Sequence, residues 1–428
     1  MVLSLKNNWK QQLQFVLTAV LMVGLVYSRA ILSVASIGLG FTILLYGQNL
    51  RLNKNIVLGI ALILLPVLAS GFGSDDTTAW WRSVEVKLSL FTIVAGILAA
   101  EFSLKQLQQL VWWLTIVVVS SALYSCYVYW MNEELILKSY LVAKVMPVLM
   151  DDDHIRYSWL IVLNIVLLVR IVFFKVECQA ELVEANFKNT FRQGQCDKQH
   201  KGKLEQWIAA LAILFLIAYL HFLAAKTGLL CLYVSIFLFV VYTITQSKLQ
   251  IGLLLILMIG FVAFIAYHSF PSLKNRVQYV LYDFSNYSKG IYTEGSSDGA
   301  RVLSLKAGWD ITQQHLLGGV GFGDVQTEVA HWHDMQHPSS KDYERFLPTN
   351  QLLIYSAGSG IVGLLCFSVG LLLLLQPLFS KNIFYVVLIT VLLLPLITDD
   401  SFEGQHGVSI FALFVGLGIG VKRGGLRA

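Results

Sequence analysis

Three basic residues lie beside long apolar stretches of the sequence and have the chemistry to bind a diphosphate. Arg156 directly precedes one such stretch, Lys226 lies in the short turn between two others, and Arg301 lies in a long polar segment. Arginine offers a diphosphate a planar fork of hydrogen-bond donors, and lysine offers a compact charge. A cation near membrane depth is costly unless it is paired or lines a wet cavity. Two interpretations therefore stay open for each residue: a structural or interfacial ion pair, or part of a cluster that binds a diphosphate.

A glycine-rich stretch over residues 316–324 reads LLGGVGFGD. Its closely spaced glycines, with Gly321 and Gly323 just before Asp324, allow a tight turn whose backbone amides can face a ligand. The stretch is not flanked by the strand and helix of a nucleotide-binding unit, so it does not predict a nucleotide site. A plain loop turn is the favoured interpretation.

Histidines and paired carboxylates offer two further kinds of chemistry. His331, His333 and His337 lie within seven residues, where one of them could act as a general base near neutral pH. Their spacing fits no standard zinc pattern. The pairs Asp75-Asp76 and Asp399-Asp400 could hold a divalent cation, but exposed loop carboxylates are more often only solubilising. We therefore predict no metal site.

The chain that must position these residues is dominated by apolar stretches. Of its 428 residues, 56% are hydrophobic and 13% are charged, and the mean hydropathy is +0.67. Ordinary soluble domains carry about 25% charged residues. At roughly 20 apolar residues per bilayer crossing, the sequence predicts an all-α, polytopic membrane protein with about twelve transmembrane helices. A soluble multidomain enzyme and a disordered chain are excluded, and continuous rather than alternating apolar stretches disfavour an outer-membrane barrel. The expected spans are 12–28, 31–49, 56–73, 85–100, 107–130, 157–175, 207–224, 228–247, 251–269, 351–375, 382–398 and 407–421.

Charge placement predicts that both ends of the chain face the cytoplasm. The N-terminal segment carries Lys6 and Lys10, and the C-terminal tail carries Lys422 and Arg423. The loop 399–406 instead contains Asp and Glu and no Lys or Arg. Positively charged loops stay on the cytoplasmic side, and an even number of spans returns the chain to that side.

This topology divides the chain into three regions. Residues 1–269 hold nine spans and a cytoplasmic loop near 176–205, residues 270–350 form a long external loop, and residues 351–428 hold three spans and a basic tail. A loop that long in a compact chain is usually functional. The 31 basic residues are spread over many loops and make no dense patch, so the net charge of +5 does not indicate a nucleic-acid partner. The apolar spans make the lipid bilayer an expected partner.

The order of these motifs resembles that of the O-antigen ligase and polymerase family. The resemblance rests on Arg301, Trp309, the turn Gly319-Val320-Gly321-Phe322-Gly323-Asp324, the box Pro348-Thr349-Asn350-Gln351-Leu352, and the glycine-containing stretch Ser356–Gly363. The turn Lys226-Thr227-Gly228 resembles the family's SRxG turn, and Glu85–Leu90 and His154–Ser158 are similar to upstream segments of some members.

The resemblance implies a membrane glycosyltransferase of the GT-C type in the bacterial inner membrane, with its active site facing the periplasm. Its donor would be a glycan on undecaprenyl diphosphate. The acceptor would be a hydroxyl of lipid A–core for a ligase, or of the glycan itself for a polymerase. Cations can stabilise a lipid diphosphate leaving group without a metal or another cofactor. The acceptor hydroxyl needs a base or a well-placed hydrogen bond.

Two residues depart from the family pattern. Thr349 stands where the box carries a histidine before Asn350, and Lys226 stands where the turn carries an arginine. We expect Arg156, Lys226 and Arg301 to bind the diphosphate, with Arg301, His337 and Asn350 as the catalytic set. His337 is included because a loop histidine could take over from the missing one.

Ligase is the leading hypothesis, and three alternatives stay open. A polymerase of the same superfamily differs only in its acceptor. A non-catalytic homologue is compatible with Thr349. A transporter of a lipid-linked glycan is disfavoured, because it would need charged residues along its spans, and Arg170 near a cytoplasmic end is the one clear basic residue inside a span.

Overall fold

The computed structural model of the chain describes residues 2–45, 52–134, 136, 146–151, 153–172, 203–246, 249–269, 271–288 and 297–427. Within these ranges every regular element is a helix, which confirms the all-α prediction for this part of the chain. The elements are α1 (Val2–Tyr27), α2 (Arg29–Leu44), α3 (Lys54–Ala69), the 3-10 turn η2 (Ser70–Phe72), α4 (Thr77–Ala99), α5 (Leu104–Met131), α7 (His154–Val172), α8 (Lys203–Leu223), α9 (Lys226–Thr245), α10 (Leu249–Ser269), α11 (Pro271–Ser288), α12 (Ser297–Gln314), α13 (Val325–Gln336), η3 (Asp342–Glu344), α14 (Gln351–Leu375), η4 (Gln376–Leu378), α15 (Ile383–Thr398) and α16 (Gln405–Arg427). The predicted loop 176–205 lies outside the described residues up to position 202.

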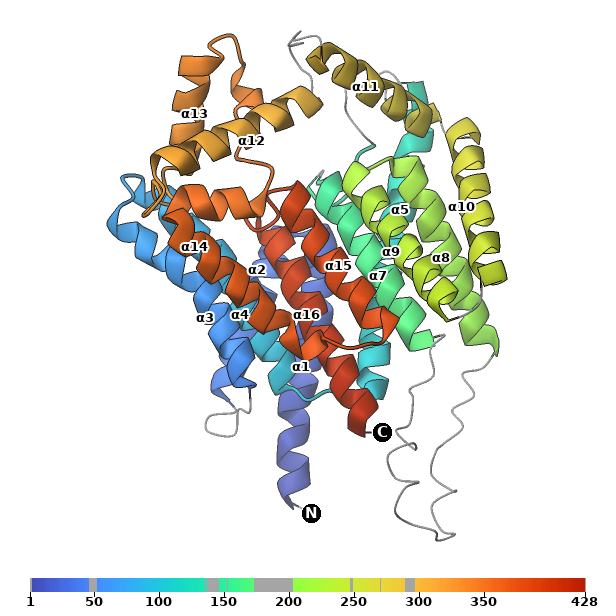
Figure 1. Cartoon of the computed structure of the whole chain (residues 1–428). Coiled ribbons are helices and arrows are strands. Elements are labelled where there is room, and N and C mark those ends of the chain that lie inside the picture. The colour runs from blue at the N-terminus through green and yellow to red at the C-terminus, as the bar shows by residue number, and fades with distance from the viewer. Residues whose placement is uncertain are drawn as a thin grey trace, which may run out of the picture.

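Each predicted span overlaps a helix. In the described part of the chain, seven helices are long and apolar enough to cross a membrane by length and composition: α1, α3, α5, α8, α9, α14 and α16. Helices α2 and α15 are apolar but shorter. The helices form one bundle, with both termini at the same end (Figure 1). The count of about twelve spans stays a prediction.

Small residues let the central helices pack closely. Helix α16 is buried along most of its length and packs against α4, α5 and α7. Helix α14 runs along α3, where Gly59 and Gly370 face each other: a Cβ on Gly59 would lie 2.7 Å from the carbonyl oxygen of Gly370. Close backbone approach through glycine is a common way to pack helices in membranes.

Helix α14 is broken one third of the way along. Ser359 has φ −141° and Gly360 has φ +64°, so the backbone leaves the helix there and resumes it at once. A Cβ on Gly360 would lie 2.2 Å from the carbonyl oxygen of Leu317. Only glycine adopts this left-handed conformation readily, so the glycine-containing stretch that follows the box makes a kink.

The segment predicted to form the long loop, residues 270–350, contains three helices among its described residues. Helices α11, α12 and α13 cover the end of the bundle opposite the termini (Figure 1). Their sequences are polar on average, which is why they produce no apolar stretch in the sequence. A small core of Ala307, Ile311, Val325, Val329 and Ala357 attaches α12 and α13 to the first part of α14.

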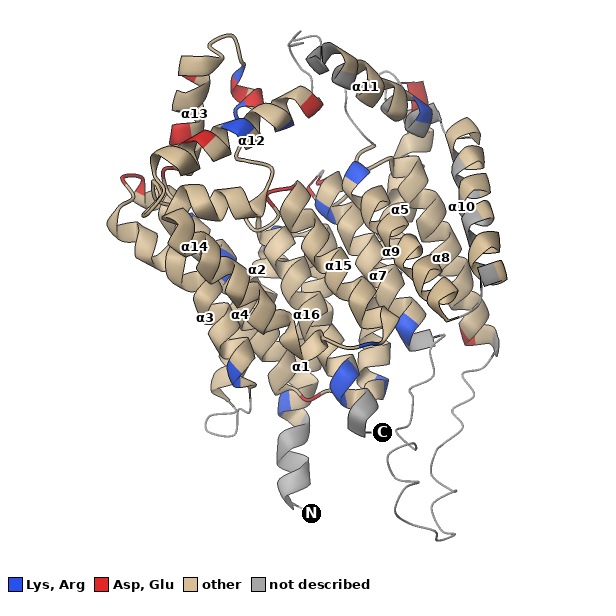
Figure 2. Cartoon of the chain, viewed as in Figure 1, with Lys and Arg blue, Asp and Glu red and all other residues tan. Residues whose placement is uncertain are grey.

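Charges are distributed unequally between the two ends of the bundle. Figure 2 shows more Lys and Arg than Asp and Glu at the end where the termini lie, and most of the Asp and Glu at the end covered by α12 and α13. This asymmetry agrees in direction with the orientation predicted from the positive-inside rule.

Candidate functional site

The glycine turn is a structural clamp between α14 and the start of α4. The amides of Val320 and Gly321 donate to the carbonyls of Ala357 and Gly358 at 2.8 and 3.0 Å, which are the carbonyls freed by the break in α14. In return, the amide of Ile361 donates to the Leu316 carbonyl at 2.8 Å. The turn therefore completes the hydrogen bonding of a broken helix, as buried backbone groups require.

The second half of the turn bonds to the loop before α4. The Asp324 carboxylate accepts from the amides of Asp75 and Asp76 at 2.8 and 2.9 Å. The amide of Gly323 donates to Ser74 Oγ at 3.2 Å, and a Cβ on Gly323 would lie 2.3 Å from the Asp76 carbonyl oxygen. Gly321 has φ +95°, which a side chain would strain. The turn amides point into the protein, in agreement with the plain-turn interpretation.

Arg156 is fixed at the start of α7 by two carboxylates. Its guanidinium donates to Asp153 Oδ2 at 2.9 Å, and to both the carbonyl and the carboxylate of Asp400 at 3.0 and 2.8 Å. Its Nε is buried and has no hydrogen-bond partner among the described residues. Gly407 leaves room for the side chain, since a Cβ there would lie 3.3 Å from this Nε. Arg156 thus joins α7 to the turn between α15 and α16.

Arg301 and Asn350 reach the same turn from other elements. Arg301, in the first part of α12, donates to the Thr398 carbonyl at 3.3 Å. Asn350 caps α14 by accepting from the amides of Leu352 and Leu353, and its side-chain N–H donates to the Ile397 carbonyl at 3.0 Å. The end of α15 is therefore held by one arginine and by the asparagine of the predicted box.

Lys226 completes a closed series of contacts that links the three cations Arg156, Lys226 and Arg301, which we call the circuit. Its Nζ binds both oxygens of Asp298, at 2.5 and 2.6 Å, and Asp298 lies one turn before Arg301 on α12. Gly228 packs on α7: a Cβ there would lie 2.4 Å from the Cβ of Ser158. Contacts thus run from α7 to α9, from α9 to α12, from α12 to the end of α15, and back to Arg156. The structure brings the three predicted diphosphate ligands together at one end of the bundle.

Asp399 is the most unusual group in this circuit. It is buried, and its Oδ2 has no hydrogen-bond partner among the described residues. Burial, together with the charge of Asp400, raises the pKa of Asp399 to about 7, although Arg156 and Arg301 act in the opposite direction. A carboxylate with a raised pKa, between two arginines, can accept a proton near neutral pH.

Thr349 is turned toward α12 and is buried. Its hydroxyl lies 3.3 Å from Ser304 Oγ, and its amide donates to the same oxygen at 3.3 Å. Ser304 lies one turn after Arg301, and its hydroxyl donates to the Arg301 carbonyl at 2.9 Å. The residue that replaces the family's histidine therefore positions the box against the helix that carries Arg301.

His337 lies in a second polar cluster, at the end of α13. Its amide donates to the His333 carbonyl at 2.7 Å, and its ring lies 5.4 Å from that of Trp332. The indole N–H of Trp332 donates to Asp310 near the end of α12, whereas Lys226 binds Asp298 near the start of the same helix. Burial and the nearby Lys306 lower the pKa of His337 from its ordinary value. The circuit around the three cations is formed without His337.

Three residues outside the predicted set, Lys87, Glu403 and Gln351, form a hydrogen-bonded group of their own. Lys87 in α4 binds Glu403 at 2.8 Å, and the other oxygen of Glu403 accepts from Gln351 at 2.7 Å. From the sequence, the Asp399-Asp400 pair of this loop was expected to be solubilising, and neither Glu403 nor Lys87 was assigned a role in the site. Lys87 lies inside the expected span 85–100, so the view that Arg170 is the one clear basic residue within a span was wrong. The available signal was this lysine together with an acidic loop without Lys or Arg, because an intramembrane cation needs a partner.

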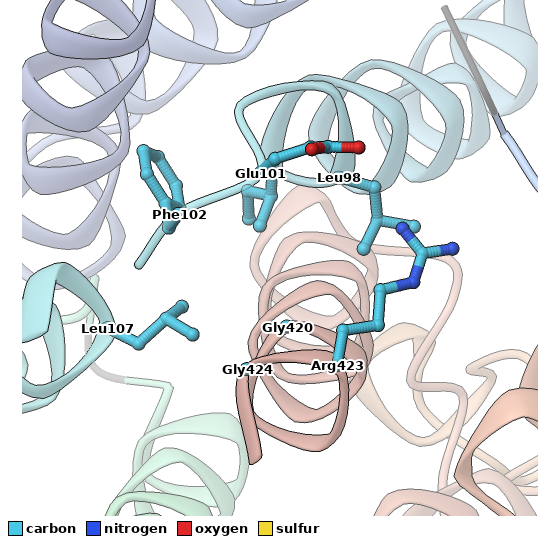
Figure 3. A pocket seen from close by; sticks show the side chains of 8 residues that line it. Leu98, Glu101, Phe102, Leu107, Gly420, Arg423 and Gly424 are labelled. Atoms are coloured by element: carbon cyan, nitrogen blue, oxygen red, sulfur yellow. The ribbon is translucent and has the colours of Figure 1, made fainter. Parts of the chain in front are cut away.

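A pocket lies at the other end of the bundle. It is lined by Ile97, Leu98, Glu101, Phe102, Leu107, Gly420, Arg423 and Gly424 (Figure 3). These residues belong to the end of α4, the loop that follows it, the start of α5 and the end of α16, on the side where both termini lie. The pocket is therefore remote from the circuit of cations.

Among the described residues, no group of three or more His, Cys, Asp and Glu is arranged to hold a metal ion. Of the two carboxylate pairs, Asp75-Asp76 contributes its backbone amides to the glycine clamp, and Asp400 of the other pair binds Arg156.

A comparison with known families agrees with the motif order. A family model described as O-antigen ligase matches residues 209–368. This region runs from α8 into α14 and contains Lys226, Arg301, the glycine turn, His337 and Asn350, whereas Arg156 and the turn after α15 lie outside it. No curated protein matches the chain. Residues 209–368 of this multi-pass membrane protein are therefore similar to the O-antigen ligase family.

Proposed function

We propose that the protein transfers a glycan from an undecaprenyl diphosphate carrier to an acceptor hydroxyl, at the periplasmic face of the bacterial inner membrane. Lipid A–core is the proposed acceptor, which makes the protein an O-antigen ligase with a GT-C type of architecture. The observation that carries the proposal is the convergence of Arg156, Lys226 and Arg301 at one end of an apolar bundle, in a chain whose residues 209–368 match an O-antigen ligase model.

The electrostatics of the circuit support an anionic donor. Each cation lies against a carboxylate: Arg156 against Asp400, Lys226 against Asp298, and Arg301 near Asp399. A diphosphate offers the same type of oxygen acceptor with more charge. Its arrival would exchange carboxylate contacts for phosphate contacts, and the cations would then stabilise the charge that develops on the leaving diphosphate.

The acceptor hydroxyl requires a group that takes its proton, and two residues are candidates. Asp399 is favoured, because it is buried, is acted on by the charges of Arg156 and Arg301, and has an oxygen without a hydrogen-bond partner and a raised pKa. Asn350, bound to the end of the same helix, would orient the acceptor. His337 is the second candidate. It lies within the family-matched region, and its lowered pKa favours the neutral ring, which can accept a proton.

The test is glycan transfer by the purified full-length protein in detergent, with an undecaprenyl diphosphate-linked glycan and lipid A–core. We expect product formation that EDTA does not reduce. Loss of activity in EDTA that magnesium or manganese restores would contradict the metal-independent mechanism. Absence of product with every acceptor would contradict the proposal and leave a non-catalytic homologue.

A gene deletion separates the ligase from the polymerase. Loss of a ligase leaves long glycan polymer on the lipid carrier, whereas loss of a polymerase leaves single repeat units. We expect the first pattern on a gel of surface lipopolysaccharide, together with an extract of carrier-linked glycan. Lipid-linked glycan retained on the cytoplasmic side would instead support a transporter.

A further inference from the structure

We propose that Lys87 is a positioning residue, which sets the turn after α15 and the start of α14 in register with each other. This inference rests on the proposed function. Lys87 lies within α4, is fully buried, and touches none of the three cations or Asp399 directly in the contacts described above. Its effect on the reaction would be transmitted through the groups that it binds.

Lys87 contacts two segments that are far apart in sequence. Its Nζ donates to Glu403 Oε2 at 2.8 Å and lies 4.9 Å from the ring centroid of Phe322, in the glycine turn. A third contact, to Ser83 Oγ at 2.7 Å, anchors the ammonium group to its own helix. The buried charge of Lys87 therefore contacts both the glycine turn and the turn after α15.

Glu403 extends this connection to the box. Its second oxygen accepts from Gln351 Nε2 at 2.7 Å, and Gln351 Oε1 accepts from the Phe402 amide at 2.8 Å. Gln351 is fully buried and directly follows Asn350. The carboxylate of Glu403 thus accepts from both the ammonium group of Lys87 and the amide of Gln351. It links the orientations of these two side chains.

A column of aromatic rings runs beside this network and strengthens it. Phe322 packs edge-on to Tyr355 at 5.0 Å, Tyr355 stacks on Phe367 at 3.9 Å, and Phe367 packs edge-on to Phe402 at 5.9 Å. The column joins the same two turns that Lys87 contacts. Ring contacts fix the separation of the turns, while the Lys87–Glu403 pair fixes their register through directional hydrogen bonds.

The consequence concerns the residues on either side of the network. Asp399 and Asp400 lie on the turn that Glu403 anchors, and Asn350 lies beside Gln351. If Lys87 is removed, the turn can shift relative to the box, and the base then moves relative to the group that orients the acceptor. Misplacement of reacting groups by about 1 Å can cost a hundredfold in rate. The contacts of Lys226 and Arg301 with the donor would be changed less.

The test compares Lys87→Met, Lys87→Arg and Glu403→Gln in the full-length protein in detergent. We expect Lys87→Met to lower kcat about a hundredfold while the donor KM changes less than kcat. Lys87→Arg, which keeps the charge and the hydrogen bonds, should recover most of kcat. Glu403→Gln is the milder variant, because it keeps the hydrogen-bonding shape but removes the charge, and it should lower kcat in the same direction.

Lys422→Met is the matched control. Lys422 also donates two hydrogen bonds, to the carbonyls of Pro377 and Phe379, and it also lies over an aromatic ring, that of Tyr385, but at the other end of the bundle. This variant should lower the unfolding temperature without lowering kcat. If Lys87→Met and Glu403→Gln keep the wild-type kcat, or if Lys422→Met lowers kcat equally, Lys87 is only structural. A wild-type protein without transfer activity would instead contradict the proposed function.

Discussion

At the scale of single residues, the charges of the arginines and the lysine in the candidate site are compensated by nearby carboxylates. Arg156 is held by Asp153 and Asp400 on separate segments, and its side chain is only 14% exposed. Ion pairs this sheltered are screened less by solvent than surface pairs, and removing one partner leaves an uncompensated charge. The same contacts that preorganise the cations therefore make the site sensitive to single substitutions.

Arg301→Ala should nearly abolish glycan transfer. Arg301 is the cation nearest the end of α15, and the loss of one preorganised contact to a developing charge costs about 3 kcal/mol, or roughly a hundredfold in rate. Initial rates with the purified protein measure the effect. Arg29→Ala is the control, because Arg29 forms an exposed ion pair with Asp151 at the same end of the bundle. Its activity should stay within about fivefold of wild type. Equal losses in the two variants would argue against a specific role for Arg301.

The pH dependence of transfer identifies the base. With Asp399 as the base, activity should rise as the pH increases through about 7, because the carboxylate must lose its proton to accept another. Asp399→Asn should then lower kcat by about a hundredfold or more, while His337→Ala should have little effect. With His337 as the base, the midpoint would instead lie below that of an ordinary histidine, since burial lowers the pKa of that histidine. A midpoint in that lower range that disappears in His337→Ala would overturn the assignment to Asp399.

At the scale of elements, the break in α14 organises the site. The break frees carbonyls of the first part of the helix, the glycine turn binds them, and the turn's Asp324 then binds the amides before α4. The first part of α14 is thereby held at an angle to the second, with Asn350 at its start. The break itself lies at a residue with positive φ, Gly360.

Gly360→Ala should destabilise the fold and reduce activity. An alanine at φ +64° is strained, and its Cβ would lie 2.2 Å from the Leu317 carbonyl oxygen. We expect a loss of about 1–3 kcal/mol in the free energy of unfolding, seen as a lower unfolding temperature in detergent. Gly260→Ala is the control, because Gly260 lies within α10 and no atom lies within 4 Å of the position that the added methyl group would take. That variant should be neutral or slightly more stable. An unchanged unfolding temperature in Gly360→Ala would mean that the kink relaxes at little cost.

At the scale of the whole molecule, orientation in the membrane decides which substrates reach the site. The helices α12 and α13 and the circuit of cations lie at the end of the bundle opposite the termini (Figure 1). A periplasmic location of this end would give the site access to a carrier-linked glycan after its transport across the membrane. A cytoplasmic location would exclude lipid A–core that has already been exported.

Cysteine labelling tests this orientation. Ser339 is exposed beyond α13, and Ser380 is exposed between η4 and α15, at the end where the termini lie. In a chain whose five native cysteines are replaced, an impermeant thiol reagent should label Ser339→Cys in cells with a permeabilised outer membrane. Ser380→Cys should react only after the inner membrane is lysed. The reverse pattern would place the site in the cytoplasm.

The sequence alone determined the class of the molecule and the order of its motifs. Apolar stretches are set by composition along the chain, so the helices α5 and α9 could be predicted within a few residues. Arg301, the glycine turn and the box could be aligned with a family because their order is a property of the sequence. The helices α11 to α13 could not be predicted, since their polar sequences gain stability from packing on the bundle rather than from an apolar period.

Only the tertiary structure decided which residues meet. Asp399 is more than half the chain away from Arg156, and helix α5 lies between Lys87 and Arg156 in the sequence. Nothing in the local sequence of Asp399 distinguishes a buried carboxylate from a solubilising one. Burial and the charges of neighbouring helices set the pKa of Asp399, and both depend on how α7, α12 and α15 pack. The glycine turn illustrates the same limit: its spacing predicted a tight turn, but only the break in α14 explains which carbonyls its amides bind.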